Sequence, residues 1–167
     1  MSSSAVTVVA PGLTVWIEAG DAGVRGIHFR EPSSETSAGP PHPVAKEAAS
    51  QLRAYLAGRL WRFDLPLDMH GTPFQLRVWT ALLEIPYGET WSYRRLAERI
   101  ESPAAVRSVG AANGANPVAI VVPCHRVIGA NGKLTGYGGG LSLKQQLLEL
   151  EAKHAWQSRQ SATGTQR

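Results

Sequence analysis

One short segment brings together the residue types that nucleophilic catalysis needs. Cys124, the only cysteine in the chain, is followed directly by His125 and preceded by an apolar, β-branched run between Pro117 and Pro123. Such a run predicts a short buried strand or extended segment that delivers the thiol to the floor or mouth of a pocket. A free cysteine usually behaves as a small buried hydrophobe, and neighbouring side chains on an extended segment point to opposite faces. This segment alone therefore leaves both a structural and a reactive thiol open.

A carboxylate near the C-terminus supplies the third group of an activated cysteine. The spacing of three leucines over residues 143–148 predicts a helix that Ser142 caps, and Glu151 continues its buried face. A buried carboxylate is costly without a partner, whereas a frayed helix end would leave it in solvent. His125 would take the Cys124 proton, directly or through a water, and Glu151 would orient the imidazole and stabilise its charged form. By itself this chemistry would also suit a cysteine hydrolase.

The residues before this segment predict two short helices joined by a tight break. Ser92 caps a helix over 93–100 that carries three arginines, and Ser102 opens a second helix from Ala104 to about Ala112. The second helix is built from small residues, with Arg107 as its one long side chain. The pair is typical of a helix-turn-helix, from which a protease gains nothing, although an ordinary helical hairpin would look the same. Small residues permit close approach to another helix or to a nucleic-acid groove, so both remain open.

The other elements must position these groups. Turn sequences separate three β-like runs near the N-terminus, which predicts an antiparallel meander. Thr72 forms a capping box with Gln75 at the start of a later helix. The expected elements are strands over 6–9, 13–17 and 24–29, a loop over 31–43, a helix over 44–56, a strand or extended linker over 63–67, and a helix over 73–85.

Together these elements predict an α+β fold. A small N-terminal domain of antiparallel sheet plus helix, residues 1–70, would pack on a mainly helical C-terminal domain, residues 71–156, that contains the helix-turn-helix. Residues 157–167 are polar and predict a flexible tail. Nothing in residues 1–70 assembles into a reactive constellation, so we expect a supporting role for that domain.

Composition narrows the class of protein. The chain has 167 residues, a net charge of +4 and a pI of about 9.6, which favours a polyanionic partner. A single cysteine excludes an internal disulfide and a multi-cysteine zinc site, and it fits a reducing cytosol. No signal peptide is recognisable, and no apolar run approaches the roughly 18–20 residues of a membrane helix. We therefore expect a cytoplasmic protein with no membrane contact.

A glycine-rich loop over 129–140 follows the cysteine segment. It matches neither the Walker A nor the dinucleotide pattern, so we do not predict nucleotide binding. Glycines on both sides of Tyr137 favour instead a loop that folds over a pocket and presents its backbone amides to a ligand.

Pro123-Cys124-His125-Arg126-Val127, preceded by Asn116-Pro117, resembles the active-site signature of the O6-alkylguanine-DNA alkyltransferases, also called methylated-DNA–protein-cysteine methyltransferases. The resemblance covers about residues 72–151, whereas residues 1–70 are similar to the family's variable N-terminal domain only in length and strand-then-helix order. The flanking motifs agree in order and spacing: Pro86-Tyr87-Gly88-Glu89, Ser92-Tyr93, Val106-Arg107, Tyr137 with Gly139-Gly140, and Leu147-Leu148-x-x-Glu151.

The resemblance implies direct reversal of DNA alkylation damage. The partner would be double-stranded DNA carrying O6-alkylguanine, with O4-alkylthymine as a further substrate. The second helix would enter the minor groove, Arg107 would fill the space left in the duplex, and the damaged base would be flipped into the pocket. Cys124 would attack the alkyl carbon, Tyr93 would donate a proton toward the leaving guanine, and Asn116 would brace the turn that carries the cysteine. Each molecule would act once, as a monomer, with no cofactor and no metal, and cooperative binding along DNA stays open.

By the same resemblance, further residues belong to two surfaces. The DNA-binding set is Arg107, Ala105, Ser108, Ala112, Arg94 and Ser92. The substrate-pocket set is Pro123, Val127, Tyr137, Gly138 and Gly139. Some relatives carry serine where Gly138 stands, so a backbone amide would serve there instead of a hydroxyl. The N-terminal zinc site of some relatives cannot be carried over, because no cysteine lies in that part of the chain. Trp91 has no expected role beyond packing or a phosphate-side contact.

Two other classes of protein are alternatives. A protein that binds alkylated guanine and recruits other repair factors would lack the reactive cysteine, and Cys124 is present here. A transcriptional regulator would need Asn, Gln and several Arg side chains on its second helix to read base edges in the major groove, and this helix is rich in alanine. Direct alkyl transfer is therefore the favoured hypothesis.

Overall fold

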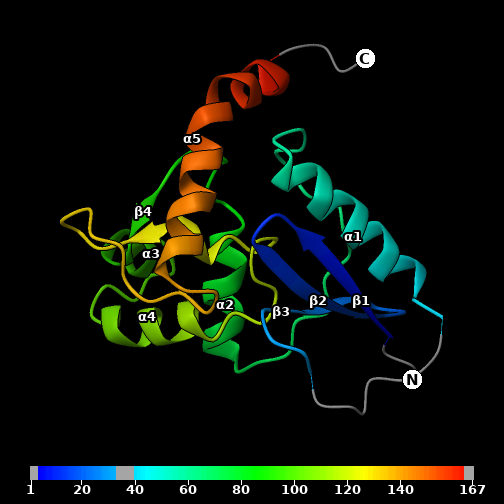
Figure 1. The fold of residues 1–167 in the computed structure, drawn as a ribbon. Helices are drawn as coiled ribbons and strands as arrows, with labels where there is room; N and C mark the ends of the chain where they lie inside the picture. The colour runs from blue at the N-terminus through cyan, green and yellow to red at the C-terminus, as the bar shows by residue number, and fades with distance from the viewer. Residues whose placement is uncertain (1–3, 33–39, 164–167) are drawn as a thin grey trace.

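The computed structural model describes residues 4–32 and 40–163 of the chain. Its N-terminal part is an antiparallel meander in the order β1-β2-β3, beside which helix α1 packs (Figure 1). The bounds are β1 (Ser4–Ala10), β2 (Leu13–Gly20), β3 (Gly23–His28) and α1 (Pro43–Leu56). The predicted meander and helix are thus confirmed. Most of the predicted 31–43 loop, residues 33–39, lies outside the described residues.

The meander forms because apolar side chains alternate along its central strand. Val15, Ile17 and Ala19 of β2 are fully buried, and the residues between them are partly exposed. They share one core with the buried alanines of α1 and with Leu52. One sheet face therefore lies against the helix, as expected for an α+β fold.

An extended connector runs from α1 to the second half of the chain. Val24 in β3 donates its backbone N–H to the carbonyl of Pro66 at 2.8 Å and forms an isolated parallel bridge with Leu67. No named strand forms over residues 63–67. The extended-linker alternative is therefore the correct one.

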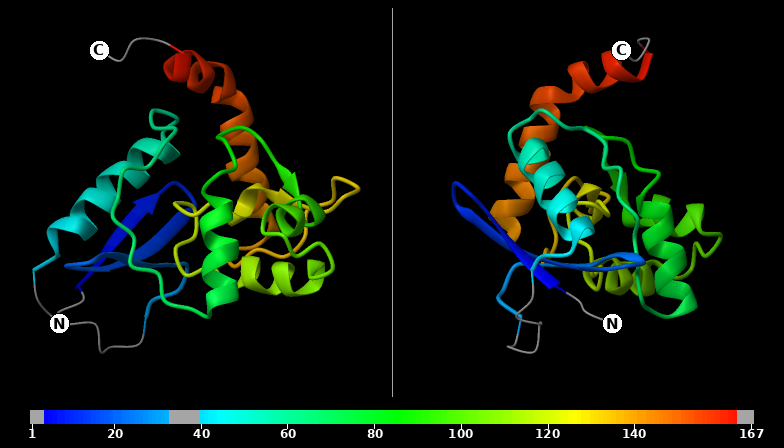
Figure 2. Two further views of the ribbon diagram at one scale, coloured as in Figure 1. Left: turned by 180° about the vertical axis from the view of Figure 1, so that it is seen from behind. Right: turned by 90° about the vertical axis from the view of Figure 1, so that its right-hand side faces the viewer.

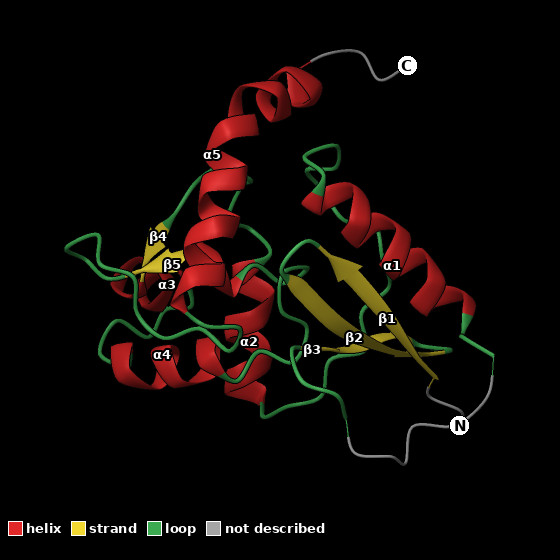
Figure 3. Cartoon of the chain, in the orientation of Figure 1, coloured by secondary structure: helices red, strands yellow, loops and turns green. Residues whose placement is uncertain are grey.

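Three helices group to one side of the meander (Figure 3). They are α2 (Pro73–Leu82), α3 (Tyr93–Arg99) and α4 (Val106–Gly114). The predicted capping box of Thr72 and Gln75 and the predicted cap at Ser92 are both present. The cap predicted at Ser102 is wrong, because Ala105 holds the N-cap position of α4 and makes no side-chain capping bond. The backbone closes that turn instead, with the Ala105 N–H donating to the Ser102 carbonyl at 2.9 Å.

The segment before Cys124 is a compact loop rather than the predicted strand or extended segment. Within the described residues it pairs only through isolated bridges. Ile120 has a φ of 73°, a left-handed conformation that β-branched residues rarely adopt. The loop reverses around it, with the Val121 N–H donating to the Ala119 carbonyl at 2.9 Å. Its apolar side chains are nonetheless buried. The apolar, β-branched run therefore predicted burial correctly but not strand pairing.

A short parallel pairing follows that the sequence did not predict. After the 3-10 turn η1 (Cys124–Arg126), strand β5 (Val127–Ile128) pairs with β4 (Trp91–Ser92). This pairing sets the start of α3 beside the cysteine segment. Trp91 is buried there, and the Arg95 guanidinium lies 4.6 Å from the centre of its ring. Packing therefore accounts for Trp91.

The last helix, α5 (Leu141–Thr163), differs from its prediction at both ends. It begins before Ser142, so Ser142 is not its cap. It continues beyond Trp156, so a flexible tail is wrong for residues 157–163, where helix-forming Gln, Arg and Ala are frequent. Figure 2 shows these last turns extending away from the body of the protein. In the described ranges, no helix combines the length and apolarity needed to cross a membrane.

Candidate active site

Cys124 begins η1 directly after a tight turn. Pro123 has a φ of −82° and a ψ of 62°, and the Cys124 N–H donates to the Val122 carbonyl at 2.8 Å. This is the geometry of an inverse γ-turn. It places the thiol, whose residue is 6% exposed, on the wall of a cavity of about 450 Å³. The cysteine therefore lies at a pocket, as predicted.

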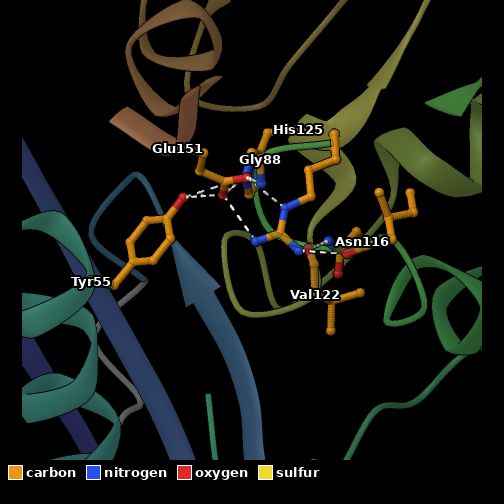
Figure 4. A network of polar contacts seen from close by, with 8 residues as sticks. Tyr55, Gly88, Asn116, Val122, His125 and Glu151 are labelled. Atoms are coloured by element: carbon orange, nitrogen blue, oxygen red, sulfur yellow. Dashed lines mark hydrogen bonds and ion pairs between the residues drawn. The ribbon is translucent and has the colours of Figure 1, made fainter. Parts of the chain in front are cut away.

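Asn116 holds the loop that carries the cysteine. Its Nδ2 donates to the Val122 carbonyl at 2.7 Å (Figure 4), and its Oδ1 accepts from the Val118 N–H at 3.0 Å. Asn113 adds a longer bond, from its Nδ2 to the Cys124 carbonyl at 3.4 Å. A side-chain amide that satisfies both a donor and an acceptor of one loop restricts the shape of that loop. This geometry is consistent with the bracing role expected for Asn116.

His125 and Glu151 form a buried pair. Nε2 of His125 lies 2.7 Å from Oε2 of Glu151, and the two residues are 0% and 1% exposed. Because a carboxylate only accepts, Nε2 carries the proton in this bond and the lone pair is on Nδ1. Nδ1 is buried and has no hydrogen-bond partner among the described residues. Nδ1 is therefore the ring nitrogen that is able to accept a proton.

Glu151 is the centre of a larger polar network that contains Tyr55 and Gly88 as well as His125 (Figure 4). Tyr55 on α1 donates its hydroxyl to Oε2 at 2.5 Å, and the Gly88 N–H donates to Oε1 at 3.1 Å. Arg126 reaches both oxygens, with Nε 2.7 Å from Oε1 and Nη2 3.0 Å from Oε2. A buried carboxylate with this many donors is held as an anion in one orientation.

Electrostatics keep the resting thiol protonated. Burial raises the pKa of the Cys124 thiol, against the opposing influence of a hydrogen bond from Asn116 and the charge of Lys144. Burial also lowers the pKa of the His125 imidazole despite the neighbouring Glu151, so the ring is neutral near pH 7. Burial raises the pKa of Glu151, but the hydrogen bonds and charges of His125 and Arg126 lower it by more, to about 2. A thiol beside a neutral imidazole and a carboxylate suits general-base activation during attack.

Residues expected to contact DNA are mostly on the surface of α3 and α4. Arg94, Arg107 and Ser108 are exposed, and Ala105 is partly exposed. The DNA contact predicted for Ala112 is wrong. This residue is 3% exposed and packs toward α2, where Trp79 donates its Nε1–H to the Ala112 carbonyl at 2.8 Å. That side chain cannot reach DNA in this structure.

Ser92 and Tyr93 lie at the start of α3. The Ser92 hydroxyl accepts the Arg95 N–H at 3.0 Å, so it is used as a helix cap. The Tyr93 hydroxyl lies 2.6 Å from Oγ1 of Thr135 in the glycine-rich loop. Both Tyr93 and Thr135 line a groove of about 560 Å³ between α4 and that loop. The groove shares Tyr137 with the Cys124 cavity, so the two hollows adjoin.

The pocket assignments need correction at three positions. Tyr137 and Gly138 line the Cys124 cavity as expected. Val127 is fully buried, and Pro123 lines a separate cavity of about 210 Å³, so neither forms the pocket wall. Gly139 does not line the cavity either, although a Cβ there would lie 3.2 Å from the ring of Phe29, which does.

Sequence reasoning missed three contributions to this site. Tyr55 comes from the part of the chain that we expected to hold no reactive group, and nothing in its local sequence marks it. Arg126 was visible only as a member of the signature, without a role. Lys144 is fully buried on α5, and its Nζ donates to the carbonyls of Val127 at 2.7 Å and Thr135 at 3.0 Å. Its position two turns before Glu151 was the signal that could have revealed it.

The helical half of the chain is similar in sequence to known DNA methyltransferases. Residues 73–153 match the family model described as 6-O-methylguanine DNA methyltransferase, DNA binding domain. The methylated-DNA–protein-cysteine methyltransferase of Mycobacterium tuberculosis is 64% identical over 108 residues, which span 65% of this chain and 66% of that relative. The chain thus matches just under two thirds of the length of that curated relative.

Solved structures extend the similarity over nearly the whole fold. The O6-methylguanine methyltransferase of M. tuberculosis superposes with a TM-score of 0.83 at 47% identity, covering 91% of this chain and 94% of that chain. The M. tuberculosis protein OGT in complex with DNA superposes with a TM-score of 0.79 at 51% identity, covering 89% and 92%. The N-terminal meander and α1 therefore belong to the shared architecture.

Proposed function

The chain belongs to the 6-O-methylguanine DNA methyltransferase family, and from this premise we propose that it reverses DNA alkylation by moving the alkyl group of O6-alkylguanine onto Cys124. The observation that carries the proposal is the position of Cys124 on a cavity wall, next to a His125–Glu151 pair whose Nδ1 is free to take a proton. O4-alkylthymine is a second substrate in this proposal. The protein works in the cytoplasm as a monomer.

The chemistry follows from the resting protonation states. The Cys124 proton passes to Nδ1 of His125, directly or through a water, and Glu151 stabilises the imidazolium that forms. The thiolate attacks the alkyl carbon in line with the bond to O6. A carbon–sulfur bond forms, the carbon–oxygen bond breaks, and its electron pair passes to the guanine. Tyr93 donates a proton to the leaving base. The thioether is stable, so each molecule reacts once and needs no cofactor.

Access to the base follows from the surface of α4. Arg107 projects from that helix as its one long, exposed side chain. In the proposal α4 enters the minor groove, Arg107 occupies the space that the flipped base leaves, and Arg94 contacts phosphate. The base reaches Cys124 through the groove beside Tyr93 and Tyr137. Small residues at Ala105 and Ser108 let the helix approach the duplex closely.

A repair assay tests the proposal. Duplex DNA with a single O6-methylguanine is incubated with the protein, and the strand is then digested to nucleosides. We expect unmodified deoxyguanosine at that position, in an uncut strand, with Cys124→Ser leaving the lesion in place. Tight lesion binding without conversion would instead support the recruiter alternative and overturn the proposal.

A further inference from the structure

The end of strand β3 reaches the loop that carries the cysteine. Ile27 donates its backbone N–H to the carbonyl of Pro117 at 2.9 Å and forms an isolated bridge with Val118. Because β3 belongs to the N-terminal meander, the sheet is joined directly to the active-site loop. Residues 28–32 then continue along the cavity that holds Cys124. The N-terminal half therefore contributes part of the pocket wall.

Phe29 is the large apolar side chain of that stretch. The centre of its ring lies 5.6 Å from that of Tyr137, with the planes tilted by 60°. Gly139 helps to permit this approach, since a Cβ there would lie 3.2 Å from the Phe29 ring and 2.5 Å from Cδ2 of Leu143. Tilted aromatic pairs at this separation pack favourably. Phe29 is thus fixed against the glycine-rich loop that covers the pocket.

Phe29 lies beside only one of the two adjoining hollows, the Cys124 cavity and the groove between α4 and the glycine-rich loop. Phe29 lines the Cys124 cavity but not the groove between α4 and the glycine-rich loop. In the proposed function the base enters through that groove, and its alkyl group points to the sulfur. Phe29 therefore shares with Cys124 the cavity that would receive the alkyl group, and an apolar ring in its wall is compatible with alkyl groups but limits their size.

We infer that Phe29 is a specificity-determining residue, which sets the largest alkyl group that the pocket accepts. This inference rests on the proposed function and deepens it, because it names the wall that separates small from large substrates. It also gives the N-terminal domain a part in substrate choice.

The test compares two lesions in one duplex sequence, O6-methylguanine and O6-benzylguanine. The second-order rate constant for Cys124 alkylation is measured with each, and the benzyl-to-methyl ratio is compared among variants. We expect Phe29→Ala and Phe29→Leu to raise the ratio about tenfold, because a few carbon atoms of pocket volume discriminate substrates by at least that factor. Phe29→Trp should lower it. Phe74→Leu, which removes the same volume from a partly buried position outside the cavity, should leave the ratio unchanged.

The benzyl-to-methyl ratio distinguishes a residue that selects the substrate from one that only holds Tyr137 in place. Loss of support for Tyr137 would slow the reaction with both lesions and leave their ratio unchanged. Thermal unfolding of each variant shows whether it is folded, and the Leu and Trp variants decide the matter if Phe29→Ala is not. An equal benzyl-to-methyl ratio in folded Leu and Trp variants would overturn the inference while leaving methyl transfer, and hence the proposed function, intact. Failure of the unaltered protein to transfer methyl is a different result, which would overturn both.

Discussion

Tyr55 and Glu151 lie 96 residues apart in the sequence, yet the Tyr55 hydroxyl donates to Oε2 of Glu151 at 2.5 Å. The same oxygen accepts from Nε2 of His125 at 2.7 Å. Helix α1 of the N-terminal half therefore supports the carboxylate on which the imidazole depends. Burial, followed by the charge of Glu151, raises the pKa of Tyr55 well above its ordinary value, so its hydroxyl keeps the donated proton at any physiological pH.

Replacing Tyr55 by Phe should destabilise the fold. A hydrogen bond to a buried carboxylate contributes about 1.5–3 kcal/mol, and Phe keeps the ring while removing the donor. The measurement is urea unfolding near pH 7. Tyr87 provides the matched control: it is also buried and packs edge-on against Tyr55, but its hydroxyl has no partner among the described residues. Tyr87→Phe should leave stability almost unchanged, and equal losses in the two variants would contradict the role given to Tyr55.

Acid should destabilise the protein through the His125–Glu151 pair. The pKa of Glu151 falls from its ordinary 4.5 to about 2 on folding, so its contribution is complete above pH 4.5 and is lost as pH falls toward 2. At 1.36 kcal/mol per pKa unit this amounts to about 3 kcal/mol. His125 acts with the same sign, because its lowered pKa lets the unfolded chain take up a proton first as pH falls below 6.5.

Glu151→Gln tests this assignment. The variant should be less stable at neutral pH, by about 3–5 kcal/mol, because buried Arg126 loses its anionic partner. It should also alkylate more slowly and lack the stability loss between about pH 4.5 and 2. Urea unfolding of both proteins over this pH range is the measurement. Parallel stability curves would show that another carboxylate is responsible.

Arg107→Ala should impair repair of duplex DNA and spare repair of single strands, because only a duplex has a gap to fill when the base leaves. Flipping costs a few kcal/mol, so we expect a loss of about tenfold or more on duplex DNA. Arg94→Ala is the comparison: a phosphate contact should weaken binding uniformly and reduce the salt slope by about one. An equal effect of Arg107→Ala on both DNA forms would refute the gap-filling role.

The sequence predicted Glu151 of the candidate site, but not the buried polar residues Lys144 and Tyr55. Helical spacing placed Glu151 on a buried face, and the structure confirms that burial. The same spacing applies to Lys144, but lysine is so rarely buried that the pattern is easily set aside. Tyr55 could not be predicted, since its bond to Glu151 depends on where the fold places α1 relative to α5. These are distant contacts, which no local pattern encodes.

The loop before Cys124 shows a different limit. A β-branched run between prolines has the composition of a strand, but Ile120 turns the chain with a positive φ while its side chain stays buried. Periodicity reports which side chains are buried and cannot distinguish a strand from a tight apolar loop. The bonds of Asn116 to both sides of that loop maintain the turn.

The mass of the Cys124 peptide after reaction with O6-methylguanine DNA shows whether the alkyl group moves to the thiol. We expect one added methyl group on that peptide and one repaired lesion per protein molecule, with none in Cys124→Ala even where DNA is still bound. An unmodified Cys124 in protein that has removed the lesion would contradict this expectation.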